Sequence, residues 1–344
     1  MKVLIIVGLK TISIKDLGSS KDIFTRVNLL DCNDIDTEFI KVPNRNDNKL
    51  LDILKNTNIK QYNAILFEHT RYPKSLKYLK QNHPNIKRLV RTHNAEFLHA
   101  IDRIKAIINT YGFRVFLKPL YLIKLLYRSI RSLYLDIQCA KLATGILSCN
   151  EIESDIYWSK FTNKKNIYNV NTYTNLTNVK PSASSGSNIL LMGSILPTEF
   201  NDNAFKILSE ELNRNKTYVT FNVTGAYSYY RLTDDRVNFK GIVDDYIKEM
   251  ISNDVICILS PYGYGIKTRI FEGLYLGKKV FVHKKIYNRL PALLKKNVFT
   301  WTGVSGTLIN EINSCISRDH NYPIMDLENY IKRSNIEFLS SFNS

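Results

Sequence analysis

The residues with the clearest chemical pattern lie in one stretch of the second half of the chain. Gly263 and Gly265 follow an apolar run, Val255 to Leu259, and precede a segment with helical spacing. A glycine loop that leads into a helix presents unpaired backbone N–H groups and the positive end of the helix dipole, which together favour an anion. Lys267 adds a positive charge in the first turn, and Glu272 is spaced to accept hydrogen bonds from neighbouring hydroxyls, as on a ribose. The pattern predicts a site for a nucleoside diphosphate.

This stretch resembles the donor-binding motif of GT-B glycosyltransferases, especially of the large retaining group often called the GT4-like family. The match reads Gly-x-Gly-Ile-Lys-x-Arg-Ile-x-Glu-Gly-Leu-x-x-Gly-Lys-x-Val. The resemblance implies that Lys267 faces the diphosphate of a nucleotide-sugar donor and that Glu272 binds its ribose. It extends the donor contacts to the rest of the loop and the first helical turn, namely Gly263, Tyr264, Gly265, Ile266, Thr268 and Arg269.

Two positions depart from the usual pattern of that family. A second glutamate commonly stands eight positions before the ribose glutamate, and Tyr264 stands there in this chain. The loop at Gly193 resembles the family's other donor loop, but Ser194 follows it where an arginine and lysine pair usually holds the diphosphate. Lys267, with Arg269, is therefore expected to carry more of the phosphate charge. The resemblance favours a retaining transfer, and the change at Tyr264 leaves inversion as the alternative.

A second group of candidates follows the fourth predicted strand. The residues from Arg91 to Glu96 resemble a His-Asn-x-Glu element of the same family. The resemblance gives His93 a contact with the donor sugar near the reacting carbon; the alternative is a histidine that only hydrogen-bonds its loop. Glu96 is a candidate for the base that takes the acceptor hydroxyl proton in an inverting reaction. Its alternative role is a negative charge that complements a helix dipole.

The elements that must position these residues follow from patterns along the whole chain. Short apolar runs alternate with segments of helical spacing, as in a parallel sheet covered by helices. A stretch poor in large apolar residues, with the run Ser-Ala-Ser-Ser-Gly-Ser, separates two such series. The expected strands are 2–8, 37–43, 63–69, 87–94, 145–150, 167–171, 219–225, 237–241, 255–260, 280–283 and 298–301, with a further one that starts at 188.

The chain is therefore expected to be α/β, with two Rossmann-like doubly wound domains that face each other across a cleft, as the resemblance to GT-B enzymes implies. The expected parts are an acceptor-binding domain at 1–175, a linker at 176–187, a donor-binding domain at 188–322 and a helix at 323–344 that crosses back to the first domain. A length of 344 residues fits two domains of ordinary size.

Composition narrows the setting in which the protein works. The five cysteines are scattered, which is typical of a reduced cytoplasmic protein, and we expect neither a secretory signal nor a membrane-spanning helix. The formal net charge of +17 predicts an anionic partner or surface. The segment 103–135 contains no acidic residue among many basic and apolar ones. It is either a basic amphipathic helix that lies on an anionic membrane at the inner face of the cytoplasmic membrane, or a helix packed in the first domain.

The prediction that joins these features is a glycosyltransferase. It would move a sugar from a nucleotide-sugar donor to a hydroxyl of a glycan or glycolipid, as in bacterial capsule, O-antigen or lipopolysaccharide synthesis. No metal or other cofactor is expected, because a helix dipole and Lys267 can stabilise the departing diphosphate. The alternatives are a nucleotide-sugar epimerase or hydrolase of the same fold, a catalytically silent scaffold, and a basic nucleic-acid-binding protein. Nucleic acid is not the expected partner, since no known reading motif carries the basic residues.

Overall fold

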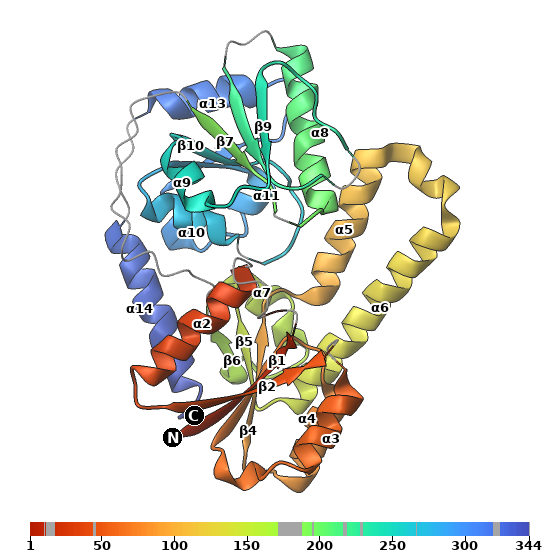
Figure 1. Cartoon of the computed structure of the whole chain (residues 1–344), viewed down its shortest axis with the longest axis vertical. Coiled ribbons are helices and arrows are strands. Elements are labelled where there is room, and N and C mark those ends of the chain that lie inside the picture. Colours follow the sequence, from red (N-terminus) through yellow and green to blue (C-terminus); the bar gives the residue numbers. More distant parts are fainter. Residues whose placement is uncertain are drawn as a thin grey trace.

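The protein contains two parallel sheets, each of six strands and each covered by helices (Figure 1). The computed structural model describes residues 1–9, 11, 18–43, 46–170, 188–194, 196–215, 219–227, 230–265, 267–318 and 324–343. The expected linker at 176–187 and the expected boundaries at 175 and 322 lie outside the described residues. The prediction of an α/β chain with two doubly wound units is confirmed.

The first sheet has the strand order β2-β1-β3-β4-β5-β6. Its strand β1 forms where the sequence is continuously apolar: Val3 to Val7 is buried on both faces, as a central parallel strand requires. The strands are β1 (Lys2–Gly8), β2 (Asp36–Val42), β3 (Ala64–Glu68), β4 (Lys87–Thr92), β5 (Gly145–Ser148) and β6 (Ile167–Asn169).

The helices of the first domain begin at residues suited to helix starts. The side chain of Asn46 accepts hydrogen bonds at the start of α3, and Pro73 opens α4, where its missing N–H costs nothing. The helices are α2 (Gly18–Asp31), α3 (Asp47–Lys55), α4 (Pro73–Asn82), α5 (Glu96–Tyr111), α6 (Pro119–Leu142) and α7 (Glu151–Ile156). Short 3-10 helices are η2 (Ile59–Gln61), η3 (Gly112–Leu117), η4 (Trp158–Lys160) and η5 (Lys164–Asn166).

The segment 103–135 is not a single helix, which corrects the sequence-based expectation. It spans the second half of α5, the 3-10 helix η3 and the larger part of α6, and α5 and α6 pack against each other as a hairpin (Figure 1). Gly112 ends α5 with a φ of 58°, a conformation that glycine adopts readily, and Pro119 opens α6. The chain therefore turns back on itself between these two residues.

The second sheet has the strand order β12-β11-β10-β7-β8-β9. Its strands are β7 (Ile189–Met192), β8 (Phe221–Thr224), β9 (Val237–Gly241), β10 (Val255–Ile258), β11 (Lys279–His283) and β12 (Val298–Trp301). The helices around it are α8 (Glu199–Arg214), α9 (Tyr246–Ile251), α10 (Thr268–Tyr275), α11 (Lys284–Tyr287), α12 (Ala292–Lys295) and α13 (Leu308–Ser317). Each sheet thus has helices of its own, so each can form a separate core.

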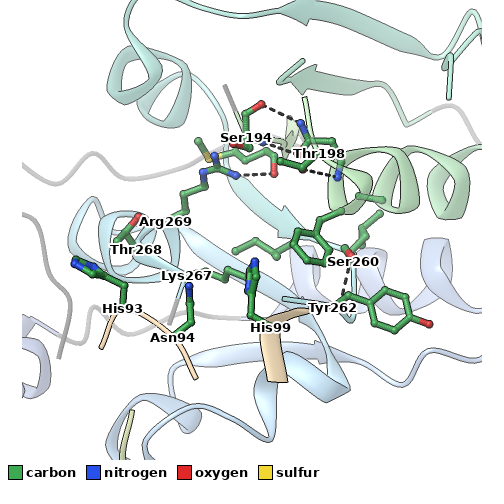
Figure 2. Close-up of a pocket in the computed structure, with 16 residues that line it drawn as sticks. His93, Asn94, His99, Ser194, Thr198, Ser260, Tyr262, Lys267, Thr268 and Arg269 are labelled. Carbon is green, nitrogen blue, oxygen red and sulfur yellow. Dashed lines mark hydrogen bonds between the residues drawn. The ribbon is translucent and has the colours of Figure 1, made fainter. Parts of the chain in front are cut away.

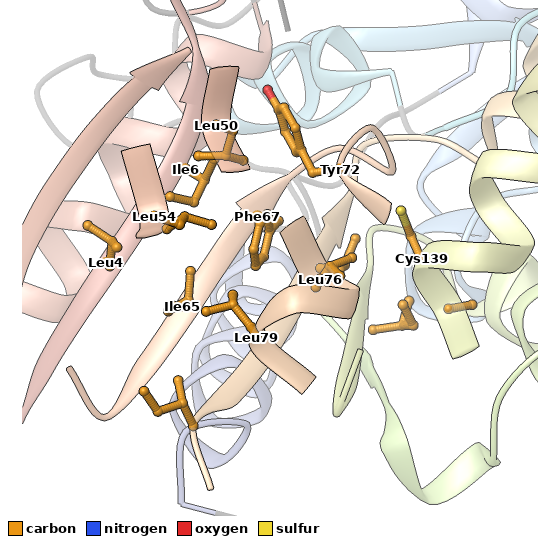
Figure 3. Close-up of a cluster of buried hydrophobic side chains, with 14 of the residues drawn as sticks. Leu4, Ile6, Leu50, Leu54, Ile65, Phe67, Tyr72, Leu76, Leu79 and Cys139 are labelled. Atoms are coloured by element: carbon orange, nitrogen blue, oxygen red, sulfur yellow. The ribbon is translucent and has the colours of Figure 1, made fainter. Parts of the chain in front are cut away.

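Buried apolar side chains fill the space between sheets and helices in both domains. Figure 3 shows one cluster of the first domain, where residues of β1 and β3 pack against α3 and α4; the labelled members are Leu4, Ile6, Leu50, Leu54, Ile65, Phe67, Tyr72, Leu76, Leu79 and Cys139. The last helix, α14 (Ile324–Ser340), contacts both domains. Its Tyr330 stacks on Phe271 of the second domain, while Phe338 belongs to the same apolar cluster as Val3 and Ile5 of β1.

Each sheet contains one point where the strand order reverses. The reversal lies between β1 and β3 in the first sheet and between β7 and β10 in the second. The connections leave such a pair of strands in opposite directions, so a crevice opens beyond their carboxyl ends, where ligands bind in doubly wound folds. The residues that follow β7 and β10 are therefore the first place to look for a site.

Candidate functional site

Two adjoining cavities lie at the carboxyl ends of β7 and β10. The larger has a volume of about 370 Å³ and the smaller about 310 Å³. Both are lined by residues that follow β7 and by the first turn of α10; the shared residues are Met192, Ser194, Thr268 and Arg269. The two cavities therefore meet at the start of α10.

Both domains contribute to the wall of the larger cavity. In Figure 2, His93, Asn94 and His99 of the first domain lie on one side, with Ser194 and Thr198 of the second domain on the other. The cavity thus occupies the interface between the domains.

Lys267 lies in this wall beside further positive charges. Burial and the nearby charges of Arg269 and Arg289 together lower the pKa of its ammonium group to about 8, against the attraction of Asp102 and Glu153. The Nζ atom lies 5.6 Å from the centre of the Phe200 ring. An incoming anion would relieve the repulsion among these cations, which makes this end of the cavity selective for negative charge.

The glycine loop has the backbone conformation that the sequence predicts. Gly263 has a φ of 91° and Gly265 a φ of 87°, values that residues with a Cβ rarely adopt. A Cβ at Gly263 would stand 2.6 Å from Nζ of Lys267, and one at Gly265 would collide with the side-chain amide of Asn94. Small residues are therefore required here both for the turn and for the close approach of Lys267 and of the first domain.

Two amides of this loop, which we expect from the sequence to face a pyrophosphate, donate to carboxylates of the protein. Gly263 N donates to Oδ2 of Asp102 at 3.1 Å, and Gly265 N donates to Oε1 of Glu153 at 2.8 Å. Both carboxylates belong to the first domain, and burial raises the pKa of Glu153 to about 7. At the start of α10, Thr268 and Arg269 line both cavities.

The smaller cavity contains Glu272, as the resemblance implies for a ribose-binding carboxylate. The Glu272 side chain is almost fully buried in the cavity wall, and its Oε1 accepts a hydrogen bond of 2.8 Å from the hydroxyl of Tyr246. Lys21 of the first domain also lines this cavity; its ammonium group contacts that hydroxyl and lies 3.9 Å from the centre of the tyrosine ring. Ile242, Val243 and Asp244 complete the wall. The cavity combines the carboxylates of Glu272 and Asp244 with a partly apolar recess.

Gly193 and Arg269 shape the junction between the cavities. Gly193 N donates to the carbonyl of Thr224 at 2.8 Å, and a Cβ at this position would stand 2.7 Å from that oxygen. The close packing of β7 and β8 therefore requires glycine here. Nη1 of Arg269 donates to the carbonyl of Met192 at 3.1 Å, and burial lowers the pKa of this guanidinium group. This hydrogen bond holds the Arg269 side chain where the two cavities meet.

His93 borders the larger cavity and is held by a buried network beneath it. Its Nε2 lies 2.8 Å from Oε2 of Glu68, and its Nδ1 lies 3.7 Å from Oδ2 of Asp22. Glu68 also accepts from Nη2 of Arg26 at 2.7 Å. Burial acts to raise the pKa of Glu68, but Arg26, His93 and Arg91 outweigh it and bring that pKa to about 2. The carboxylates of Glu68 and Asp22 thus fix the orientation of the His93 ring.

Glu96 lines neither cavity. It is the first residue of α5, and its carboxylate pairs with Nη2 of Arg71 at 2.8 Å and with Nδ1 of His69 at 3.5 Å. Burial opposes ionisation, but these partners prevail and hold the pKa of Glu96 well below its usual range. Such a carboxylate is a weak proton acceptor, so its placement favours the alternative role, a charge at a helix start.

Two other residues of the motif, Tyr264 and Ile266, remain to be placed. The Tyr264 side chain lines neither cavity; its ring stacks on the guanidinium group of Arg289 at 3.9 Å. The Tyr264 carbonyl lies 2.7 Å from the side-chain amide of Asn94. Ile266, which the resemblance also places at the donor, lies outside the described residues.

Sequence reasoning missed several residues of this site. His99 lines the larger cavity, its Nδ1 is buried without a partner among the described residues, and burial together with the charge of Lys267 lowers its pKa. Its position on α5, one turn after Glu96, was the only available signal. Lys21, Asp102 and Glu153 reach the site from distant parts of the chain, and nothing local marks them. Within the described part of the chain, no cluster of three His, Cys, Asp or Glu side chains could hold a metal ion.

The sequence matches no protein-family model and no curated protein. The structure is similar to that of HepE from Anabaena in complex with UDP, with a TM-score of 0.67 over 100% of both chains at 14% identity. It is also similar to a sucrose-phosphate synthase from Thermosynechococcus elongatus, with a TM-score of 0.66 over 99% of this chain and 95% of that one at 13% identity. A third likeness is to the lipopolysaccharide outer core galactosyltransferase WaaB, with a TM-score of 0.65 over 99% of each chain at 10% identity. Two parallel six-stranded sheets that meet at an interdomain cavity, matched over the full chain by these structures, give this protein the GT-B fold.

Proposed function

We propose that this protein is a glycosyltransferase that moves a sugar from a nucleotide-sugar donor to a hydroxyl group of a glycan or glycolipid. One observation carries the proposal: the two cavities at the carboxyl ends of β7 and β10 meet at the start of α10, with Lys267 in one and Glu272 in the other. These three features are arranged in the order of the parts of one extended ligand. The larger cavity would hold the sugar, the start of α10 the diphosphate, and the buried carboxylate the ribose.

In this proposal the nucleoside occupies the smaller cavity. Glu272 accepts hydrogen bonds from the ribose hydroxyls, because a carboxylate can accept several hydrogen bonds at once. The diphosphate lies over the first turn of α10, beside Thr268 and Arg269, and the sugar extends into the larger cavity. UDP is the first nucleotide to test, since HepE has been solved with it.

The reacting carbon would then face the first domain. Lys267, Arg269 and the positive end of α10 would stabilise the charge that develops on the departing diphosphate. His93 and His99 would contact the sugar from the opposite wall, the first in an orientation fixed by Glu68 and Asp22. Closure of the interdomain cavity would exclude water, which otherwise hydrolyses the donor.

We propose retention of the anomeric configuration. None of the described residues that line the larger cavity is a carboxylate, and Glu96, the carboxylate candidate for a base in an inverting reaction, lies elsewhere. Proton NMR of the product resolves the two anomers. A product of opposite configuration to the donor would reject retention and direct attention to the two histidines as bases.

We further propose that transfer needs no metal ion, because cations of the protein already stand where the diphosphate would lie. The expected result is equal turnover with and without EDTA. Strict dependence on Mg²⁺ or Mn²⁺ would contradict this part of the proposal.

The acceptor class we favour is a bacterial surface glycan such as capsule, O-antigen or lipopolysaccharide. Its support is the likeness in fold to WaaB, named as a lipopolysaccharide galactosyltransferase. The five cysteines, all free thiols in the structure, fit synthesis in the reducing cytoplasm.

Nucleotide binding tests the central proposal. Calorimetric titration of the protein with a panel of nucleotide sugars and their free diphosphates should identify at least one ligand. Glu272→Ala should abolish that binding, because the ribose loses its acceptor. Glu328→Ala is the matched control, since this exposed glutamate lies on α14. No heat from any nucleotide sugar, or unchanged binding in Glu272→Ala, would reject the donor assignment.

A nucleotide-sugar epimerase or hydrolase of the same fold is the second candidate. The donor incubated alone separates the possibilities: a transferase leaves it largely intact, whereas an epimerase changes its sugar and a hydrolase releases free sugar. Turnover that requires an added glycan acceptor supports transfer.

A further inference from the structure

The outer face of η3 and α6 carries apolar side chains that nothing in the described structure covers. On α6 they are Leu120, Ile123, Tyr127, Ile130 and Tyr134, which are exposed by 82%, 60%, 64%, 66% and 59%. Their spacing of three and four residues places them along one stripe of the helix. At the tip of the hairpin, Phe113 and Leu117 of η3 are exposed as well. We call this surface the outer stripe.

The outer stripe is not the side of α6 that packs against the first domain. The opposite side of α6 is already packed: Leu125, Ser129, Ser132, Asp136 and Cys139 are buried against the first domain. Figure 1 shows α6 on the outside of the molecule, with α5 between its upper half and α8 of the second domain. A helix that is buried on one side and apolar on the other indicates a second binding partner.

Positive charge flanks the outer stripe along its length. Lys124, Arg128 and Arg131 are exposed on one side of it, and Arg114 and Lys118 stand at the tip of the hairpin. No acidic residue occurs from 103 to 135, and Asp136 is buried. The surface therefore combines exposed apolar side chains with uncompensated cations.

The charge continues into a groove beside the outer stripe. The groove has a volume of about 720 Å³, and Arg131 and Tyr134 form part of its wall. Arg71, Lys74 and Lys77 from the region of α4 line it too, with Asp47 as the acidic member. That carboxylate is already engaged, since it accepts hydrogen bonds from Lys74 N and Ser75 N. The groove is therefore suited to phosphate groups.

We propose that the outer stripe docks on the surface of an anionic lipid bilayer, with its apolar side chains among the acyl chains and its cations at the lipid phosphates. This is the arrangement that basic amphipathic helices adopt at membranes. No helix in the described part of the chain is long and apolar enough to span a bilayer, so the contact lies along the surface.

A second copy of the chain is a poorer occupant of the same surface. Two outer stripes brought together would place Lys124, Arg128 and Arg131 of one copy near the same cations of the other. The segment offers no carboxylate to neutralise them, and like charges across a contact oppose association. Lipid phosphates supply the missing negative charge. The net charge of +17 acts in the same direction.

Flotation of the full chain with vesicles tests the proposal. We expect the protein to float with vesicles of phosphatidylcholine and phosphatidylglycerol and to remain unbound with phosphatidylcholine alone. The triple variant Leu120→Ser, Ile123→Ser, Ile130→Ser should lose the vesicles. Its matched control replaces three exposed apolar residues elsewhere, in Val304→Ser, Met325→Ser, Ile336→Ser, and should bind as the wild type does.

A charge variant separates the electrostatic part of the binding. Each basic side chain near an anionic surface strengthens binding about fivefold at low salt. Lys124→Gln, Arg128→Gln, Arg131→Gln should therefore weaken vesicle binding on the order of a hundredfold, with a smaller dependence on salt than the wild type shows. Three exposed lysines that belong neither to the outer stripe nor to the lining of the groove provide the control, as Lys55→Gln, Lys60→Gln, Lys80→Gln.

Three outcomes would overturn the proposal. The first is a wild-type protein that does not bind phosphatidylglycerol vesicles, and the second is equal binding to neutral vesicles. The third is a wild-type dimer in light scattering that the Leu120→Ser, Ile123→Ser, Ile130→Ser variant converts to a monomer, which would assign the surface to a second copy. Circular dichroism of each variant confirms that it is folded. None of these results depends on nucleotide binding or sugar transfer.

Discussion

The charge of Lys267 is set by its surroundings rather than by a single partner. Burial and the neighbouring charges of Arg269 and Arg289 lower the pKa of this lysine to about 8. The free protein therefore holds a lysine that loses its proton just above neutral pH. The same arrangement makes a bound diphosphate favourable, since the ligand supplies the negative charge that the cavity wall lacks.

The first prediction concerns the pH dependence of UDP binding. Below pH 8 Lys267 is protonated and attracts the diphosphate; above it the charge is lost, while the phosphates of UDP are already fully ionised. Affinity should fall about tenfold between pH 7 and pH 9.5, since a hydrogen bond between charged groups is lost. Titration calorimetry across this range measures the fall.

Two substitutions serve as controls for that prediction. Lys267→Ala should bind UDP weakly at every pH, because it has no charge to lose, and it should also slow sugar transfer. Lys267→Arg should keep a flat profile, since a guanidinium group stays protonated throughout the range. A wild-type affinity that is constant from pH 7 to pH 9.5 would show that this lysine does not contact the diphosphate.

At the scale of elements, the glycine loop joins the domains as well as bordering the cavity. Gly263 and Gly265 donate to Asp102 and Glu153 of the first domain. Both glycines have positive φ, so side chains here would strain the backbone and also push the first domain away. A comparison with a glycine that has only the first of these constraints separates the two effects.

The second prediction is that Gly265→Ala damages the protein more than Gly306→Ala does. The two glycines have nearly equal φ, 87° and 86°, but only a Cβ at Gly265 would collide with Asn94, whereas Gly306 has open space around it. The backbone strain of about 1 kcal/mol should be common to both. Only Gly265→Ala should also lose nucleotide affinity. Equal affinities in the two variants, measured by calorimetry, would mean that the loop tolerates the displacement of Asn94.

The third prediction concerns a buried carboxylate of α6. Burial raises the pKa of Asp136 to about 7, although the hydroxyls of Thr70 and Tyr157 and the N–H of Phe97 donate to it. Between pH 4 and pH 7 the folded protein holds a proton that the unfolded carboxyl releases, so its contribution to stability falls as pH rises through this window. Asp136→Asn, which stays neutral, should remove a fall on the order of 3 kcal/mol.

Urea unfolding of wild type and Asp136→Asn at pH 5, 6, 7 and 8 tests this prediction. The midpoint of the wild type should decline more steeply with pH than that of the variant. Some decline should remain in the variant, because burial raises the pKa of Glu153 to about 7 as well. Parallel curves for the two proteins would show that Asp136 is ionised throughout.

The elements that sequence reasoning identified best are the strands. Runs such as Val3 to Val7 and Val255 to Leu259 are apolar on both faces, and only a central parallel strand buries them so. The segment 103–135 was wrongly predicted to be one helix because apolar residues occur on more than one side of α5, η3 and α6. The helical spacing of the apolar residues is therefore hard to recognise in the sequence. Gly112 and Pro119 marked the break, and they were the signal to follow.

For the candidate site, the motif from Gly263 to Glu272 correctly indicated where the cavities lie. It did not predict the hydrogen-bond acceptors of its backbone amides. The partners of those amides, Asp102 and Glu153, lie more than a hundred residues away in the chain and carry no local pattern. Glu96 was selected as a base by its type and position, and only the structure reveals its ion pair with Arg71. Contacts between the domains were therefore the part that the sequence could not predict.

At the scale of the whole molecule, α5 is the principal bridge between the domains. Its Asp102 pairs with Nη1 of Arg289 at 3.0 Å, its Arg103 pairs with Oε1 of Glu199 at 2.6 Å, and its Tyr111 donates to Asp202. These contacts lie beside the larger cavity. These polar contacts of α5 add to the interdomain contacts that Glu153, Lys21 and α14 make.

The fourth prediction is that Asp102→Ala loosens the closed arrangement. It leaves Arg289 without its carboxylate and Gly263 N without an acceptor, which should destabilise the protein by about 3 kcal/mol. Small-angle scattering should show a larger radius of gyration than in wild type. Lys105→Ala is the control, because this exposed lysine lies 4.0 Å from the same carboxylate and contributes little. An unchanged radius of gyration in Asp102→Ala would assign closure to the other contacts of α5.

The position of α5 between α6 and α8 has a thermodynamic consequence. If the outer stripe binds vesicles, the bilayer restrains α6, and α6 packs on the helix that carries Asp102 and Arg103. Vesicle binding and nucleotide binding then become linked equilibria, and linkage is reciprocal. The factor by which anionic vesicles change the affinity for the nucleotide must equal the factor by which the nucleotide changes the affinity for vesicles, so the two measurements check each other.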